Sequence, residues 1–334
     1  MIGRVRVPVA SQAMTRYIVY GAGAVGGTVG ICLSESGHDV ALVARGAHGA
    51  AIRSDGLRLD TPERSVTLSL PVTDDIATLR PGKDDVILLA VKSQDTDSVL
   101  NAIAGCAGAG VAVVCLQNGV ANERRALRYV PDVYAVPVIL PAEHVEPGVV
   151  IANCAPVTAI LDVGRYPSGV DDRAEEIAQA FRSSTFDSRV LPDVLRWKYR
   201  KLQSNLANAV EALIGDVPAA ENLIDRARAE ADAVLAAAGI DVATTREDRE
   251  RRGGVLRAAP VNGQDRRGGS TWQSLYRGAA VETDFLNGEI ALLGRLHGVP
   301  TPVNTLLQHE MRRAVREGIV PGSIDPNDLL SRLD

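Results

Sequence analysis

The chain has 334 residues, of which 46% are hydrophobic and 23% are charged. This length favours two domains of roughly 100 to 200 residues each, and the composition excludes a mainly disordered chain. The 36 basic and 41 acidic residues give a net charge of −5, and no local basic patch outweighs it, so we expect no nucleic-acid partner. The apolar runs are far shorter than the roughly 20 residues that span a bilayer, so we expect no membrane helix.

The N-terminus and the cysteines indicate where the protein works. The first residues lack an apolar segment of signal-peptide length, and we expect residues 1–14 to be a disordered extension. The four cysteines are Cys32, Cys106, Cys115 and Cys154. They are widely spaced and lack a CxxC pair or a nearby histidine that would complete a zinc site. This usage predicts buried thiols, no metal and a reducing, cytoplasmic location.

In the first half of the chain, short apolar runs alternate with helical stretches, which is typical of βαβ units around a parallel sheet. The predicted core strands span residues 17–20, 40–44, 86–91, 111–116 and 133–140. Their nearly continuous apolar sequences suit strands that are covered on both faces. Four further segments predict strands that flank this sheet: residues 57–59, 66–70, 149–151 and 158–162. We expect residues 149–151 and 158–162 to form a hairpin.

From about residue 171 the apolar period becomes helical, so we expect an all-helical second domain. The predicted helices span residues 172–183, 194–214, 219–238, 270–297 and 305–317. Gly239 and Gly298 stand where C-cap glycines belong, and Pro218 stands at a helix start. Residues 241–269 are polar and carry seven arginines. We expect a solvated helix extension with a loop there, and the alternative is a mobile lid over a site.

A glycine-rich turn joins the first predicted strand to a helix. The segment GAGAVGG fits GxGxxG between a strand and a helix, the context that a dinucleotide site requires. Gly21 permits the tight turn, Gly23 lets the backbone approach a pyrophosphate, and Gly26 lets the helix pack on the strand. The alternative is a turn that serves packing alone. The predicted cofactor contacts in this turn are Gly21, Ala22, Gly23, Ala24, Val25 and Gly26.

The end of the second strand indicates which dinucleotide binds. Arg45 stands where an NAD site would carry an acidic residue. A guanidinium grips a ribose phosphate, which an acid would repel, so we predict NADP(H). The alternative is an arginine that only caps the strand end. The expected fold is therefore an α/β Rossmann-type domain over residues 15–192, followed by an all-α domain over residues 193–334.

Polar residues at the ends of two later strands are candidates for the same crevice. Lys92 ends one strand, and Gln117 and Asn118 follow the next. Ligands of open α/β sheets bind outside the carboxyl ends of the strands, so we expect Lys92 and Asn118 to face the cofactor. The alternative is the solvated turn chemistry that is common at strand ends.

The helix that opens the second domain carries three polar residues on one face. Lys201, Asn205 and Asn208 fall at i, i+4 and i+7 beside an apolar stripe. Burying an amide or ammonium without a partner costs several kcal/mol, so a polar substrate is the expected partner. The alternative is a solvated face.

The last candidate segment is GGSTWQSLYRGAAVETDFLNGE. Ser270 and Gln273 fit a capping box, and the same helix N-terminus also suits a carboxylate ligand. Glu282 borders an apolar face, and it is either a surface residue or the partner of a buried lysine.

Together these motifs resemble the ketopantoate reductase family. GAGAVGG, the VK that ends in Lys92, the QNG that contains Asn118, KLxxN from Lys201, and ETDFLNGE from Glu282 with Ser270 upstream occur in the family's order and spacing. The resemblance extends from about residue 16 to residue 313. It implies a Rossmann domain, a helical domain related to that of 6-phosphogluconate dehydrogenase, and a site in the cleft between them.

The resemblance also implies an activity and residue roles. The expected reaction is the NADPH-dependent reduction of a 2-oxo acid, 2-dehydropantoate to pantoate, in pantothenate biosynthesis. Lys201 would be the general acid, and Glu282 would contact substrate or cofactor and help place it. Asn205 and Ser270 would bind substrate, as we also expect of Asn118 and Asn208. Lys92, Gln117 and Asn118 would border the cofactor, and Arg45 would contact the 2′-phosphate.

Two departures from the family pattern keep other functions open. Ala209 replaces the family's second asparagine, while Asn208 comes one position earlier, and residues 241–269 form a long insertion. The alternatives are a paralogue that acts on another oxo or hydroxy acid and a non-catalytic NADP(H) sensor. A homodimer is possible, and the expected partner is a small 2-oxo acid.

Overall fold

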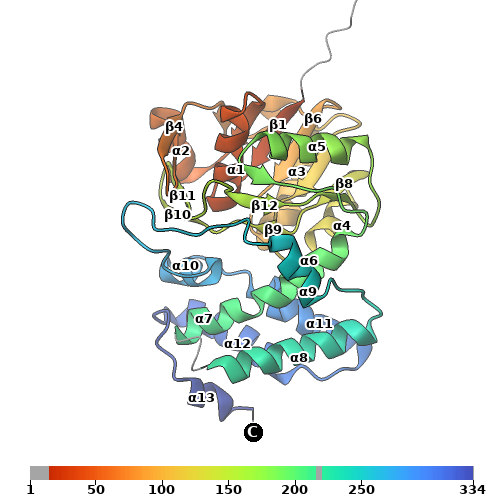
Figure 1. Ribbon diagram of the computed structural model, residues 1–334, viewed down its shortest axis with the longest axis vertical. Coiled ribbons are helices and arrows are strands. Elements are labelled where there is room, and N and C mark those ends of the chain that lie inside the picture. The colour runs from red at the N-terminus through yellow and green to blue at the C-terminus, as the bar shows by residue number, and fades with distance from the viewer. Residues whose placement is uncertain (1–14, 216–219, 334) are drawn as a thin grey trace, which may run out of the picture.

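In the computed structural model, which describes residues 15–215 and 220–333, a seven-stranded sheet forms the centre of the N-terminal domain (Figure 1). In spatial order its strands are β13 (Gly164–Arg165), β8 (Asp132–Ala135), β7 (Ala112–Cys115), β6 (Asp85–Leu89), β1 (Arg16–Tyr20), β2 (Asp39–Val43) and β5 (Val72–Thr73). All neighbours are parallel except β13 and β8. The predicted 1–14 extension and Pro218 lie outside the described residues.

The parallel register brings several strand ends to one edge of this sheet. Tyr20 pairs with both Val43 and Leu89, and Leu89 pairs with Cys115. The residues that follow these strands, including the glycine turn, therefore meet at that edge. This convergence is the geometry in which open α/β folds bind ligands.

Helices cover both faces of the sheet, as the apolar strand sequences predicted. They are α1 (Ala24–Glu35), α2 (Gly46–Asp55), α3 (Thr96–Cys106), α4 (Asn122–Ala126) and α5 (Asp172–Ser183), with the short η1 (Ile76–Leu79) and η2 (Ser93–Asp95). Ile18 and Val19 both have 0% exposure, although they point to opposite faces of β1. They belong to two separate apolar cores, one on each side of the sheet.

Two smaller sheets flank the main one. The first contains β10 (Ala142–Glu146), β11 (Val149–Ala152), β3 (Leu57–Asp60) and β4 (Ser65–Leu68), and the second contains β14 (Phe186–Asp187), β12 (Ala159–Leu161) and β9 (Val138–Ile139). The predicted hairpin of residues 149–151 with 158–162 is wrong, because β11 pairs instead with β10 across a turn at Gly148, whose φ is +81°. The strand predicted over 133–140 is two strands, β8 and β9, interrupted around Pro137.

The regular elements in the described part of the C-terminal domain are all helices, which confirms the predicted fold class. Its elements are α6 (Val194–Asn205), α7 (Ala207–Ile214), α8 (Glu221–Ala237), α9 (Thr245–Arg252), α10 (Ser270–Tyr276), η4 (Thr283–Phe285), α11 (Asn287–His297), α12 (Pro302–Glu317) and α13 (Pro326–Leu330). Gly298 ends α11 in the left-handed conformation, and Gly239 follows α8 with a φ of +65°. Among the described residues, no helix is both long and apolar enough to cross a membrane.

Two long helices predicted from periodicity are interrupted. The 194–214 helix breaks at Leu206, whose carbonyl accepts a hydrogen bond from the Asn287 side chain. The 270–297 helix ends at Tyr276, and the chain turns at Gly278, with a φ of +62°, before η4 and α11.

Residues 241–269 are anchored to the N-terminal domain, so the predicted solvated extension is wrong in part. Arg251 on α9 has 4% exposure and donates to Asp162 at 2.8 and 2.7 Å and to Asp187 at 3.1 and 3.2 Å. Ala259 N–H also donates to the Asn153 carbonyl at 2.9 Å. These contacts hold the segment against the N-terminal domain, which favours a fixed cover over a mobile lid.

Candidate active site

A cavity of about 420 Å³ lies between the two domains and collects most of the predicted site residues. The predicted residues that line it are Gly23, Ala24, Val25, Lys92, Gln117, Asn118, Lys201, Asn205, Asn208, Ser270 and Glu282. The other predicted residues, Gly21, Ala22, Gly26 and Arg45, lie outside its lining. Segments that are far apart in the sequence therefore form one cleft at the carboxyl edge of the sheet.

The glycine turn fits a bound pyrophosphate. Gly21 has a φ of +101°, a conformation that favours glycine. A Cβ on Gly26 would collide with the Gly21 carbonyl oxygen, so the helix packs closely on the strand. A Cβ on Gly23 would meet nothing within 4 Å, and this N-cap residue of α1 makes no side-chain cap bond. The helix N-terminus is thus open to an anion, as the motif predicted.

Arg45 lies at the carboxyl end of β2, where the adenosine ribose of a dinucleotide is expected. It is the N-cap residue of α2, and its side chain is exposed. In the part of the chain that the structure describes, its guanidinium makes no ion pair or side-chain hydrogen bond. A cation beside a helix N-terminus provides two groups that attract a phosphate.

Lys201 lines the cavity from α6, half-buried, and has no carboxylate or hydrogen-bond partner among the described residues. Burial is the main cause that lowers the pKa of Lys201 from its ordinary 10.5 to about 8. The positive charges of Arg252 and Arg266 add to this effect, and Asp248 opposes it. An ammonium with this pKa gives up its proton readily near neutral pH, which suits a general acid.

Two asparagines, one on α6 and one on α7, line the cavity together with this lysine. Asn205 donates to Asn118 Oδ1 at 3.0 Å, so the two predicted amides hold each other across the cleft. Asn208 lines the cavity, whereas Ala209 has 1% exposure and packs in the helical core. Asn208 lies seven residues after Lys201 and so falls on the same face of the helix, as the periodicity predicted, whereas Ala209 is turned toward the core.

Lys92 and Glu282 also make contacts between the domains. The Lys92 ammonium donates to Ser274 Oγ at 2.9 Å and to the Ala280 carbonyl. Glu282 Oε1 accepts from both N–H and Oγ of Ser93, each at 2.9 Å. Glu282 is therefore held by Ser93, and its predicted role of placing Lys201 stays a prediction.

Gln117 is a buried support for the strand ends. Its amide nitrogen donates to the Val91 carbonyl at 2.8 Å and to Thr96 Oγ1 at 2.9 Å. The backbone carbonyl of Gln117 accepts from Lys198 Nζ, also at 2.8 Å. Lys198 pairs with Glu123 Oε1 at 2.7 Å, and both side chains are almost fully buried. Our reading of the sequence missed this ion pair, although Lys198 precedes Lys201 by about one helical turn.

The capping box predicted at Ser270 is wrong. Gly269 is the N-cap residue, and Gln273 donates from Nε2 to the Gly268 carbonyl instead of capping. The Glu211 carboxylate already accepts from Gly269 N–H at 3.0 and 3.1 Å. A protein carboxylate thus takes the position that was expected for a ligand carboxylate.

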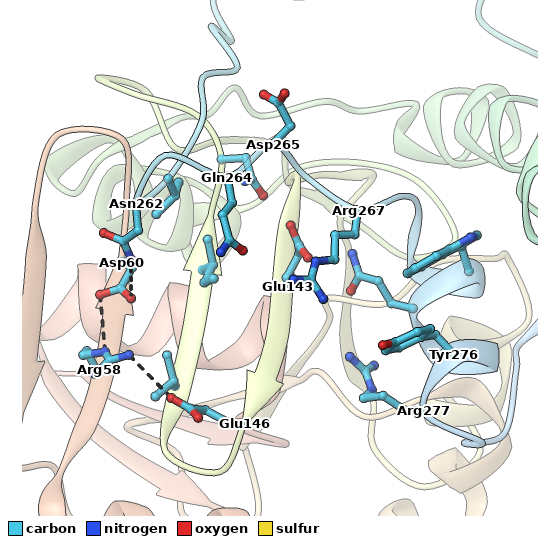
Figure 2. Close-up of a pocket in the computed structure, with 16 residues that line it drawn as sticks. Arg58, Asp60, Glu143, Glu146, Asn262, Gln264, Asp265, Arg267, Tyr276 and Arg277 are labelled. Carbon is cyan, nitrogen blue, oxygen red and sulfur yellow. Dashed lines mark hydrogen bonds and ion pairs between the residues drawn. The ribbon is translucent and has the colours of Figure 1, made fainter. Parts of the chain in front are cut away.

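Figure 2 shows a neighbouring cavity of about 500 Å³ in which charged side chains face one another. Arg58 lies 3.4 Å from Asp60 Oδ1 and 3.6 Å from Glu146 Oε1. Arg267 extends toward Glu143. None of the predicted site residues lines this cavity. Because it holds none of them and Arg58 is already paired within the protein, it is a weaker candidate than the cleft.

Comparison with known proteins identifies the family. Ketopantoate reductase PanE/ApbA matches residues 17–162, and Ketopantoate reductase PanE/ApbA C terminal matches residues 193–314. The 2-dehydropantoate 2-reductase of Archaeoglobus fulgidus is 30% identical over 91% of this chain and 99% of its own length. The chain belongs to the ketopantoate reductase family. This confirms the resemblance drawn from the motifs and makes the chain a member of a family of nicotinamide dinucleotide-binding reductases.

Solved structures agree with this assignment. A PanE/ApbA family ketopantoate reductase from Ralstonia eutropha has a TM-score of 0.77 and 26% identity, with 91% of this chain and 99% of that chain covered. A ternary structure of D-mandelate dehydrogenase with NADH and anilino(oxo)acetate has a TM-score of 0.78 at 21% identity, with coverage of 91% and 100%. The second likeness shows a shared fold only.

Proposed function

We propose that this ketopantoate reductase family member reduces 2-dehydropantoate to pantoate with NADPH. The observation that carries the proposal is the position of Lys201, an ammonium without a partner among residues 15–215 and 220–333, in the same cavity as Gly23. When bound, the nicotinamide cofactor supplies a hydride to the carbonyl carbon of the substrate. Lys201 neutralises the charge that develops on the carbonyl oxygen and donates the proton.

The other cavity residues orient the reactants. Asn118 and Asn205 fix each other's amide groups at 3.0 Å, which leaves the remaining polar atoms of both for the substrate. Ser270 and Asn208 line the same wall. We assign them to substrate binding, with Glu282 and Ser93 as a polar border of the cofactor site.

The test of this function is the oxidation of NADPH by the purified protein with a panel of 2-oxo acids that includes 2-dehydropantoate. The paralogue alternative predicts turnover with another member of the panel and little with 2-dehydropantoate. The sensor alternative predicts tight NADPH binding without turnover of any member. Homodimer formation and a cytoplasmic location also stay predictions.

The choice of NADPH over NADH depends on Arg45. Arg45→Ala should raise KM for NADPH about ten- to hundredfold, because hydrogen bonds between charged groups contribute about 1.5–3 kcal/mol. KM for NADH should change little. Arg53→Ala, in the last turn of the same helix, is the matched control. Equal effects on both cofactors would refute the assignment.

A further inference from the structure

Basic side chains outnumber acidic ones in the candidate active site. The lining contains the cations Lys92, Lys201, Arg252, Arg266 and Arg277 and the carboxylates Glu211 and Glu282. Lys92 is engaged by Ser274 and Ala280, and Arg277 donates to the His144 carbonyl at 2.6 Å. The excess positive charge therefore resides on the other three cations.

Two guanidinium groups close to Lys201 have free hydrogen-bond donors. Arg252 donates from Nε to Asp248 at 2.9 Å, but its terminal nitrogens have no partner among the residues that the structure describes. Arg266 forms no ion pair or hydrogen bond within the same ranges. Both arginines are near enough to Lys201 to lower its pKa. An anion between them and Lys201 would relieve this repulsion.

The alternative anion position is already taken. The N-terminus of α10 was the expected carboxylate site, but the Glu211 carboxylate accepts from Gly269 N–H there. A second negative charge at the same backbone group would be repelled by Glu211. The unpaired cations of the cavity are therefore better partners for a substrate carboxylate than this backbone group.

The anchoring of residues 241–269 places both arginines. Arg251 is held by Asp162 and Asp187, which fixes the end of α9 immediately before Arg252. The hydrogen bond from Ala259 N–H to the Asn153 carbonyl holds the segment before Arg266 against the N-terminal domain. An arginine whose backbone is fixed loses less conformational entropy when it binds.

We propose that Arg252 and Arg266 form the subsite that binds the carboxylate of the 2-oxo acid, next to Lys201. A carboxylate matches the planar donor geometry of a guanidinium. The insertion thus supplies substrate recognition in addition to covering the cleft. This inference rests on the proposed function, because it assumes that the substrate is a 2-oxo acid.

The test compares 2-dehydropantoate with its lactone, which keeps the reacting carbonyl but has no carboxylate. Arg266→Gln should lower kcat/KM for the acid about ten- to hundredfold, the loss expected for a charged hydrogen bond. The rate with the lactone should change less than about threefold. Arg252→Gln should act in the same direction, and Arg266→Lys should restore part of the loss.

Two arginines provide matched controls. Arg267 is the neighbour of Arg266 but lines the other cavity. Arg249 lies on α9 and shares an adjacent groove with Arg252, but it does not line the candidate active site. Arg267→Gln and Arg249→Gln should preserve the wild-type preference for the acid. The alkaline limb of the pH profile should move to higher pH in Arg266→Gln, because a positive neighbour of Lys201 is removed.

Three results would overturn the inference. Equal losses with acid and lactone in Arg266→Gln would indicate a structural effect, and an unchanged rate with the acid would exclude the subsite. If the wild type reduces 2-oxo acids and their neutral esters equally well, the proposed function stands and the subsite does not. If the wild type reduces neither class, the proposed function fails, and the inference fails with it.

Discussion

Two lysines on α6, three residues apart, have opposite surroundings. Lys198 has 2% exposure, lies 2.7 Å from Glu123 and donates to the Gln117 carbonyl. Lys201 faces the cavity with no carboxylate partner in the described structure. A buried charge with a partner fixes the domains relative to each other, whereas one without a partner has a shifted pKa and is available for a substrate. The comparison indicates that pairing, more than burial, separates structural from reactive lysines here.

The largest expected effect tests the reactive member of the pair. Lys201→Met should lower kcat/KM for 2-dehydropantoate about 10²- to 10⁴-fold, the usual contribution of general acid catalysis. The melting temperature should change little, because no charged partner is left behind. Lys201→Arg keeps the charge but holds its proton too tightly, so it should also be slow. Full activity in Lys201→Met, measured by NADPH oxidation, would end the catalytic assignment.

Lys198, the structural lysine of the two, should affect stability more than catalysis. Lys198→Met leaves the Glu123 carboxylate buried without a cation, which costs about 3–5 kcal/mol of stability. Thermal unfolding should detect a clear drop in Tm. The double variant Lys198→Met with Glu123→Gln removes both charges and should recover much of the loss. If the double variant is no more stable than the single one, the ion pair does not explain the effect.

A smaller, graded effect is expected from pH. Reduction needs the ammonium form of Lys201, whose pKa is lowered to about 8. The value of kcat/KM should therefore be level below pH 8 and fall about tenfold per unit above it. A rate profile measured from neutral to alkaline pH provides the check. If kcat/KM begins to fall only near pH 10.5, the ordinary lysine pKa, then Lys201 is not desolvated in the working enzyme.

Local sequence predicted the parts of the fold that local interactions control. The strand–turn–helix at Gly21 and the apolar strands around Ile18 were predictable, because each depends on backbone sterics and a short hydrophobic pattern. Helical periodicity predicted that Lys201 and Asn205 share one helix face, and the strand-end rule predicted the position of Asn118. That these residues meet in a cleft between the domains was implied by the family resemblance. The partner of β11 was mispredicted, because strand pairing is decided by segments far apart in the chain.

The sequence by itself determined the fold class and the family, and most of the residues that it singled out line the cleft. Only the tertiary structure decided which groups the charged side chains contact. Lys198 pairs with Glu123, Arg251 pairs with Asp162, and Glu211 accepts a hydrogen bond from Gly269 N–H. The reason is physical, because a side chain's partners depend on distances between segments that periodicity does not encode. The same packing leaves Lys201 and Arg266 in the cleft without a carboxylate partner in the described chain, and there the chemistry is expected.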